Sequence, residues 1–279
     1  MSDKTTNHRP LSTKPATLPT VIGWVIIIAY SIVSIAFVGY SALTPLRYYK
    51  KAIEYYHQGD YESAHNIVFA QSNHIPINYY NADYRESRLL GIKIAKKGDE
   101  VYFGEYHFGG YSNQKLQWIV IDKNSDGYIR LLCKDVVEQE KYDNSGFDKP
   151  VKWIDSSVRN WLNSTFYNTA FSESQKTAIV ETYDENFECY EAVSILSYPE
   201  IQDYETQNYG DFNKIIDEEG IWMKGNSVTR EKDYYWTQKD KTDECAPIYY
   251  NGVYEERDID LSCGVRPVIW IDPSKVTEV

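Results

Sequence analysis

The sequence predicts a membrane-anchored chain whose largest domain combines short β-strands with α-helices. Three observations lead to this prediction: an uncharged run over residues 21–43, a helical pattern over 44–97, and short strand patterns separated by turns from residue 98 onward. We therefore divide the chain into a tail, a transmembrane helix, a helical hairpin, a main domain and a C-terminal tail. These parts span residues 1–20, 21–43, 44–97, 98–273 and 274–279.

The run from Val21 to Leu43 contains no charged residue. At about 1.5 Å per helical residue it is long enough to cross a hydrocarbon core of roughly 30 Å, and Trp24 and Tyr40 lie near its ends, as interfacial anchors do. A cleaved secretory signal is the alternative, because Gly39 and Ser41 offer small residues for cleavage. The run is longer than the roughly 7–15 apolar residues of such signals, so we expect a segment that has the lipid bilayer as its partner.

Basic residues flank this segment equally, so the positive-inside rule does not decide its orientation. They are Lys4, Arg9 and Lys14 before it and Arg47, Lys50 and Lys51 after it. Long domains cross a membrane largely regardless of their charge. We therefore expect a single-pass protein of the cell membrane with the short tail inside and the C-terminal domain outside the cell.

The chain carries a formal net charge of −12. Nucleic acid and anionic lipid surfaces are bound by clustered Lys and Arg, which this sequence lacks, so we exclude nucleic acid as a partner. An even number of cysteines fits either disulfides or buried thiols, and their separations match neither a CxxC pair nor a zinc site. The cysteines are Cys133, Cys189, Cys245 and Cys263.

Residues 44–97 have the pattern of a helical hairpin. Thr44 followed by Pro45 predicts a helix start, Gly59 closes that helix, and Ala64 lets the next helix pack closely. A last helix over Tyr84–Ala95 is predicted to bury Leu89, Leu90, Ile92 and Ile94. The hairpin is tetratricopeptide-like, but a single repeat cannot bury its own apolar face. We expect a spacer or a dimerisation stalk through which the chain forms homo-oligomers, with a peptide-binding repeat as the alternative.

The main domain changes to strands and turns. Val101 and Phe103 alternate with polar residues, and the segments Trp118–Ile121 and Tyr128–Cys133 flank a polar turn, which predicts a hairpin. The pair Asn251–Gly252 is the strongest local hairpin signal in the chain.

Helices are expected between these strands. Val158, Trp161 and Leu162 form an i, i+3, i+4 face, and Ser172 with Gln175 has the spacing of a capping box. The main domain therefore contains both kinds of element.

Several strings of the main domain resemble the bacterial domain of unknown function 6273. They are Val158–Asn163, Phe166–Ser172 and Gly264–Ile271, and the opening Gly98–Gly104 with the hairpin around Trp118 is similar to the start of that family. The resemblance covers nearly the whole domain, and members often carry a membrane or secretion segment and a helical hairpin upstream. One departure is Tyr235–Gln238, which stands where a Trp-Leu-Arg-Ser string is expected.

That family more distantly resembles the C-type lectin-like and formylglycine-generating-enzyme-like folds, in which a late Gly-x-Arg-Pro strand, here Gly264–Pro267, closes the domain. The resemblance implies an α+β fold, namely a C-type lectin-like domain of short strands and two or three helices. It implies no activity, because such folds host sugar binding, protein binding and oxidase chemistry.

The metal-binding motifs of the sequence are incomplete. A half-match to a calcium loop lies at Asp122, Asn124, Asp126 and Gly127. Cys133 occupies the position at which an EF-hand places a bidentate glutamate, and the flanks have strand patterns, so a polar hairpin turn is predicted instead. The histidines of the helical region have no carboxylate or cysteine at ligand spacing and are expected to lie at the surface or in packing; they are His57, His65 and His74. We expect no metal and no cofactor.

Enzyme chemistry is the competing class. A cysteine oxidase needs a reactive pair near the C-terminus, for which only Cys245 and Cys263 qualify, and neither has Lys, Arg or His within two residues. The main domain has one histidine, His107, and lacks the GxSxG and HExxH motifs of hydrolases. Runs of carboxylates such as Asp184, Glu185 and Glu188 are typical of solvated faces, and a glycosidase pair cannot be chosen from them without geometry.

Aromatic residues crowd the region where lectin-like folds present variable loops. Aromatic rings stack on sugars or anchor protein partners, although strand alternation turns about half of such residues inward. The candidate ligand-binding residues are Trp222, Tyr234, Tyr235, Trp236, Tyr249, Tyr250 and Tyr254. We expect a surface protein that binds an extracellular glycan, peptide or protein partner without catalysis. The alternatives are a cysteine oxidase, a carboxylate hydrolase, or a structural subunit of a membrane complex.

Overall fold

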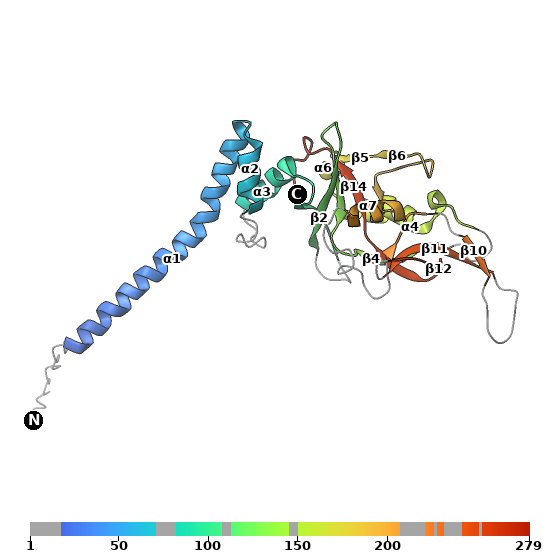
Figure 1. Ribbon diagram of the computed structural model, residues 1–279. Helices are drawn as coiled ribbons and strands as arrows, with labels where there is room; N and C mark the ends of the chain where they lie inside the picture. Colours follow the sequence, from blue (N-terminus) through green and yellow to red (C-terminus); the bar gives the residue numbers. More distant parts are fainter. Residues whose placement is uncertain are drawn as a thin grey trace, which may run out of the picture. The chain divides into compact units, whose positions relative to one another are not determined.

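The computed structural model describes most of the chain (Figure 1). The described residues are 18–70, 82–107, 113–144, 150–206, 221–225, 228–231, 242–250 and 253–279, and some side chains within them, including those of residues 37–46, are not described. The chain forms two compact units, Met1–Lys51 and Ala52–Val279.

Helix α1 (Leu18–His57) is a continuous helix of 40 residues. It runs through Thr44 and Pro45, so the predicted helix start at these residues is wrong. Proline inside a helix removes one backbone hydrogen bond, but the segments on both sides favour helix and the helix continues. Within the described residues, no helix combines the length and the apolar character that crossing a membrane requires.

The hairpin between α1 and α2 (Tyr61–Ala70) forms as predicted. Gly59 has a φ of +79°, the left-handed conformation that ends many helices and that glycine adopts without strain. Asp60 then begins α2, since its side chain accepts a hydrogen bond from the Ser63 amide at 3.1 Å. Ala52 and Ala64 are fully buried, which confirms that small residues allow close packing here.

Helix α3 (Ala82–Ile94) joins the helical region to the main domain. Ile92 of this helix and Ala95 just after it are buried in the same core as the strands. Their burial confirms the predicted inner face of the helix. A second link runs from α2, where His65 Nε2 lies 2.6 Å from the Asp99 carboxylate. The apolar face that a lone hairpin cannot bury by itself is therefore covered by the domain that follows it.

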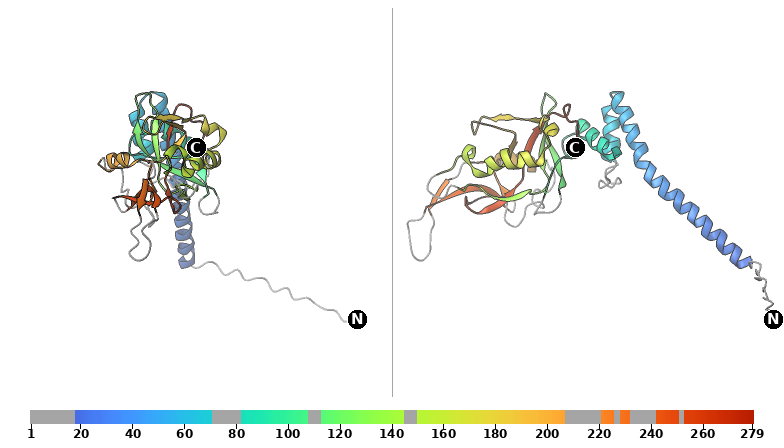
Figure 2. Two further views of the ribbon diagram at one scale, coloured as in Figure 1. Left: turned by 90° about the vertical axis from the view of Figure 1, so that its right-hand side faces the viewer. Right: turned by 180° about the vertical axis from the view of Figure 1, so that it is seen from behind.

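The first sheet is antiparallel and contains the predicted early hairpin. Its strands are β1 (Glu100–Tyr106), β2 (Gln114–Lys123), β3 (Ile129–Cys133), β14 (Val268–Ile271) and β5 (Ile179–Val180), in that order, and β8 (Val193–Ser194) also pairs with β14. Figure 2 shows the C-terminal red strand among green strands from the start of the domain. The last strand therefore lies inside this sheet, where it pairs antiparallel with β3 on one side and with β5 and β8 on the other.

The second sheet contains the late hairpin. Its strands are β10 (Val228–Glu231), β11 (Thr242–Tyr250), β9 (Ile221–Trp222), β13 (Ser262–Val265) and β4 (Glu138–Lys141), and β12 (Val253–Asp258) pairs with β11. Tyr250 pairs directly with Val253, so β11 and β12 form an antiparallel hairpin, and Asn251 and Gly252 between them lie outside the described residues. The hairpin predicted from that dipeptide is confirmed.

Short helices lie between the strands. They are η1 (Trp153–Asp155), α4 (Ser157–Trp161), the π-helical η2 (Leu162–Phe166), α5 (Tyr167–Ala170), α6 (Glu173–Lys176) and α7 (Tyr198–Thr206). Val158 and Leu162 are buried, and the Ser172–Gln175 capping box has both of its hydrogen bonds, as predicted. Two further strands, β6 (Thr182–Asp184) and β7 (Cys189–Glu191), form a separate antiparallel hairpin.

The Gly264–Pro267 signature connects the two sheets. Chain order takes β13 of the second sheet through Arg266 and Pro267 into β14 of the first. Arg266 is buried, and its Nε donates to the Cys133 carbonyl at 2.7 Å, while burial lowers its pKa to about 10. The domain is α+β, with antiparallel pairing in the first sheet and helices interleaved in sequence between the strands.

Candidate functional site: an exposed tyrosine pair on a locked hairpin

The structure corrects part of the predicted aromatic surface. Trp222 is 1% exposed, packs against Tyr142 with ring centroids 5.3 Å apart, and donates its indole N–H to the Glu140 carbonyl at 2.7 Å. Tyr249 is fully buried. Both residues lie on inner strands of the second sheet, so their rings belong to the core and cannot touch a ligand.

The structure describes only some of the other candidate residues. Tyr254 is 44% exposed, and its ring contacts Tyr198 edge-on at 5.2 Å. Tyr250 lies in β11, but its side chain is outside the described part of the chain. Tyr234, Tyr235 and Trp236 are also outside the described residues.

A second aromatic pair lies on the β6–β7 hairpin, outside the aromatic surface that the sequence predicts. Tyr183 and Tyr190 are directly opposite each other in the strand register. Their side chains are 50% and 63% exposed, and their ring centroids are 4.8 Å apart at an interplanar angle of 48°. Cross-strand neighbours point to the same face, so the two rings form one exposed aromatic patch.

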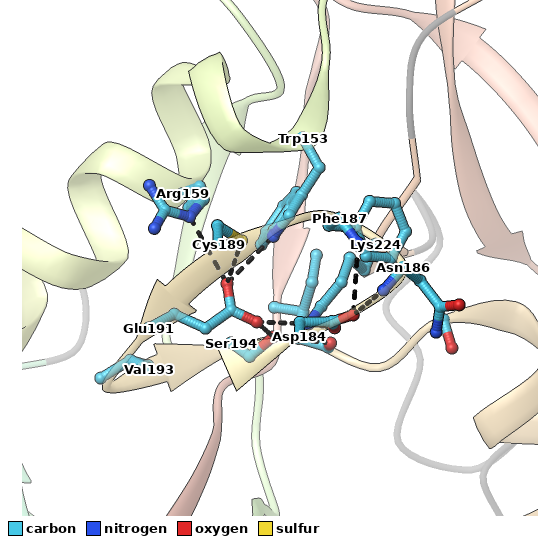
Figure 3. Close-up of polar contacts among 12 residues, drawn as sticks. Trp153, Arg159, Asp184, Asn186, Phe187, Cys189, Glu191, Val193, Ser194 and Lys224 are labelled. Carbon is cyan, nitrogen blue, oxygen red and sulfur yellow. Dashed lines mark hydrogen bonds and ion pairs between the residues drawn. The ribbon is translucent and has the colours of Figure 1, made fainter. Parts of the chain in front are cut away.

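The opposite face of this hairpin is tied to a buried ionic cluster (Figure 3). Side chains alternate along a strand, so Asp184 and Glu191 face away from the tyrosines. Lys224, whose side chain is 4% exposed, contacts both carboxylates, with Nζ 2.7 Å from Asp184 Oδ2 and in an ion pair with Glu191 Oε1. Lys224 lies on the segment after β9, so this contact joins the hairpin to the second sheet.

Glu191 is the centre of the cluster. Its side chain is 2% exposed, and it accepts hydrogen bonds from the Trp153 indole at 3.0 Å and from the Ser194 hydroxyl at 2.6 Å. Arg159 of α4 places its guanidinium 3.5 Å from the same carboxylate and donates to the Tyr190 carbonyl at 2.6 Å. The strand that carries Tyr190 is therefore held on its backbone and on its inner side chain.

The carboxylate of Asp184 orders the loop that joins the strands. It accepts hydrogen bonds from the amides of Asn186 at 2.9 Å and Phe187 at 3.4 Å. Burial opposes the charge of this carboxyl, but the hydrogen bond and charge of Lys224 outweigh burial and lower its pKa. Glu188 has a φ of +53°, which is unusual for a residue with a side chain.

The charges of the cluster balance, since two cations meet two carboxylates. Lys224 and Arg159 supply the positive charges, and the aromatic rings of Trp153 and Phe187 lie 5.8 and 5.5 Å from the lysine ammonium. Groups that are buried and already hydrogen-bonded are held in place and do not offer sites to a substrate. The cluster therefore positions the hairpin, and the tyrosine pair is the part that a ligand can reach.

The prediction that Asp184 belongs to a solvated acidic run is wrong, because Asp184 pairs with the buried Lys224. The other two members of that run, Glu185 and Glu188, are exposed as predicted. The alternation of Tyr183 and Tyr190 with inward-facing residues was a usable signal in the sequence. The sequence alone does not show which face of the hairpin is buried, because Lys224, which pairs with the inner face, lies far from the hairpin in the chain.

The cysteines have the properties of packing residues. Cys133, Cys189 and Cys263 are buried and are not in disulfides. Burial raises the pKa of Cys133 to about 12 and also raises that of Cys189, which keeps these thiols protonated at neutral pH. The side chain of Cys245, the other member of the candidate oxidase pair, lies outside the described residues.

The calcium-like segment is a hairpin turn, as predicted. The Asn124 side chain accepts hydrogen bonds from the amides of Asp126 at 3.1 Å and Tyr128 at 2.9 Å, and Gly127 has a φ of +86°. Within the described part of the chain, no group of three or more His, Cys, Asp or Glu side chains is arranged to hold a metal ion.

Fold and site together define an α+β domain that presents aromatic side chains on a fixed hairpin. The family model described as a domain of unknown function (DUF6273) matches residues 126–273. The match spans more than half of the chain, and the chain belongs to this family. No curated protein and no solved structure matches the chain.

Proposed function

We propose that this chain is a membrane-anchored surface protein whose α+β domain binds an extracellular glycan, peptide or protein partner without catalysis. The observation that carries the proposal is the tyrosine pair, Tyr183 and Tyr190, exposed on a hairpin whose inner face is fixed by buried ion pairs. Aromatic rings held rigidly at the surface lose little conformational entropy when they bind. We also propose that this α+β domain has a C-type lectin-like fold, on the basis of its Gly264–Pro267 signature.

Membrane attachment is supported by the uncharged run of Val21–Leu43, all of which lies within α1. Its described side chains include a set of exposed apolar residues that would be costly to leave in water. This set is Ile22, Trp24, Val25, Ile26, Ile27, Ile28, Tyr30, Ile32, Val33 and Ile35. The orientation with the domain outside rests on the translocation of long domains regardless of charge.

The enzyme alternatives gain less support. A cysteine oxidase needs an accessible thiolate, whereas Cys263 is buried and the pKa of Cys133 is raised to about 12. A carboxylate hydrolase needs a carboxyl group that can reach substrate, whereas the Glu191 side chain is 2% exposed and already hydrogen-bonded. Recognition by exposed aromatic residues requires neither condition.

The test is binding of the full chain, in detergent micelles, to immobilised probes of different chemistry. The probes are chitohexaose, a hexalysine peptide and the same peptide with every lysine acetylated. We expect at least one probe to bind the wild-type chain and to lose affinity with the double substitution Tyr183→Ala and Tyr190→Ala. The matched control is Tyr61→Ala, which removes a tyrosine that is 58% exposed on helix α2 and is not among the candidate ligand-binding residues. If no probe depends on the tyrosine pair, the proposal is wrong.

A further inference from the structure

The exposed face of the β6–β7 hairpin is acidic as well as aromatic. Glu181, Glu185 and Glu188 are exposed residues of the same short segment that carries the tyrosine pair. Glu181 and Glu185 flank β6, each two residues from Tyr183, and Glu188 lies in the turn that leads into β7, two residues before Tyr190. Among the residues that the structure describes, no ion pair with these three carboxylates is found, whereas the carboxylates on the inner face are both paired.

From this juxtaposition we infer that the hairpin face recognises a basic peptide segment, through Lys or Arg side chains that contact the rings of Tyr183 and Tyr190. This inference rests on the proposed function and names its partner class. A cation over an aromatic face is attracted by the negative face of the ring, and adjacent carboxylates add attraction of the same sign.

The two cations that pair with Glu191 cannot serve this face themselves. Lys224 and Arg159 lie on the inner side of the hairpin, where their side chains are 4% and 14% exposed and contact Glu191. Both cations, which come from α4 and from the segment after β9, are thus paired on the inner side, whereas the three outer carboxylates have no ion-pair partner among the described residues. Charge complementarity therefore favours a cationic partner over an anionic glycan or an anionic lipid surface.

Rigidity gives the face its selectivity for a defined segment. The Tyr190 backbone is held by Arg159, and the loop between the strands is held by Asp184. A preorganised face binds a flexible peptide with less ordering cost on the protein side.

The experiment measures affinity of the full chain in detergent micelles for the hexalysine peptide, its fully acetylated form and chitohexaose. The first variant is Tyr183→Ala with Tyr190→Ala. The second changes Glu181, Glu185 and Glu188 to Gln. The control changes Glu54, Glu105 and Glu255, which are exposed on other elements, to Gln and so matches the change in net charge. Unfolding by denaturant is measured for every variant.

We expect hexalysine to bind the wild-type chain and to lose about tenfold or more in affinity in both hairpin variants, while the control triple variant stays within about threefold of wild type. Acetylation of the peptide should abolish this binding. Tyrosine-dependent binding of chitohexaose or acetylated peptide that the hairpin glutamines leave unchanged would overturn the inference and keep the proposed function. Hexalysine binding that falls equally in the control variant would mean diffuse attraction to a chain of net charge −12 and would overturn the inference. If no probe depends on the tyrosines, both fail.

Discussion

Lys224 is the residue on which the position of the β6–β7 hairpin depends. It is a buried cation that contacts two carboxylates from that hairpin, and one of them, Glu191, is also bonded by Trp153 and Ser194. A buried ion pair is weak evidence of net stability, but removal of one partner leaves an uncompensated charge in the interior. At the residue scale the cluster therefore joins the hairpin to α4 and to the segment after β9.

Replacing Lys224 with Met should destabilise the fold by about 3–5 kcal/mol, because Asp184 and Glu191 lose their shared counter-ion. Denaturant unfolding measures the change. The control is Lys134→Met, since Lys134 pairs with Glu100 at side-chain exposures of 34% and 45% and should cost less than about 1 kcal/mol. A loss at Lys224 no larger than at Lys134 would show that the buried cluster does not hold the hairpin.

A second ion pair predicts a pH effect. Arg130 Nη2 lies 2.6 Å from Glu200, and Ser197 donates to the other oxygen of this carboxylate from its amide and its hydroxyl, each at 2.7 Å. Burial would raise the pKa of Glu200, but the charge of Arg130 and these hydrogen bonds outweigh burial and lower it below the ordinary 4.5.

A carboxyl with a lowered folded-state pKa contributes stability above its unfolded pKa and loses it as pH falls through the folded value. The stability difference between wild type and Glu200→Gln should therefore be constant from about pH 7 to 5 and shrink below about pH 4.5. Denaturant unfolding at a series of pH values measures this difference, with Glu173→Gln as a control on a side chain 91% exposed. A difference that stays constant down to about pH 3 would contradict the lowered pKa.

At the scale of elements, the turns and bulges depend on a few glycines. Gly104 interrupts the β1–β2 register with a φ of +77°, and a Cβ there would lie 2.7 Å from the Ala170 carbonyl oxygen and 2.8 Å from the Phe171 ring. Gly127 has a φ of +86° in the β2–β3 turn, with nothing within 4 Å of a Cβ. A side chain would strain the backbone at both positions, but only Gly104 also lacks room for a Cβ atom.

Gly127→Ala should cost about 1–2 kcal/mol from backbone conformation alone, and Gly104→Ala should cost more because it adds a collision with backbone. Thermal or denaturant unfolding of the two variants gives the comparison. Equal losses in the two variants would show that the bulge in β1 relaxes around the new methyl group.

Local elements were predictable because their signals lie within a few residues. The β11–β12 hairpin and the Ser172–Gln175 capping box are both present, because hairpin formation and capping depend on near neighbours. Burial of Trp222 and the partnership of Asp184 with Lys224 depend on contacts between distant segments, so the sequence pattern assigned both wrongly. The continuous α1 was missed because Pro45 usually marks a helix start.

At the scale of the whole molecule, we propose that the uncharged run anchors the chain in a membrane and that the α+β domain binds a partner. The uncharged run lies in the first compact unit, and the tyrosine pair lies in the second. If the domain faces outward, its exposed tyrosines are reachable from the medium.

Enzymatic iodination of intact cells should therefore label Tyr183 and Tyr190, which are 50% and 63% exposed, and should leave the buried Tyr142 unlabelled. Peptide mass spectrometry identifies the labelled residues, and lysed cells provide the control. Labelling that occurs only after lysis would place the domain on the inner side and would refute the proposed orientation.

The central claim is that the tyrosine pair on the locked hairpin is the binding surface. The most direct measurement is the dissociation constant of a bound probe for the wild-type chain and for the Tyr183→Ala, Tyr190→Ala variant. The prediction is a rise of about tenfold or more, equivalent to about 1.4 kcal/mol, with an unchanged free energy of unfolding. An unchanged dissociation constant in a folded double variant would contradict the claim.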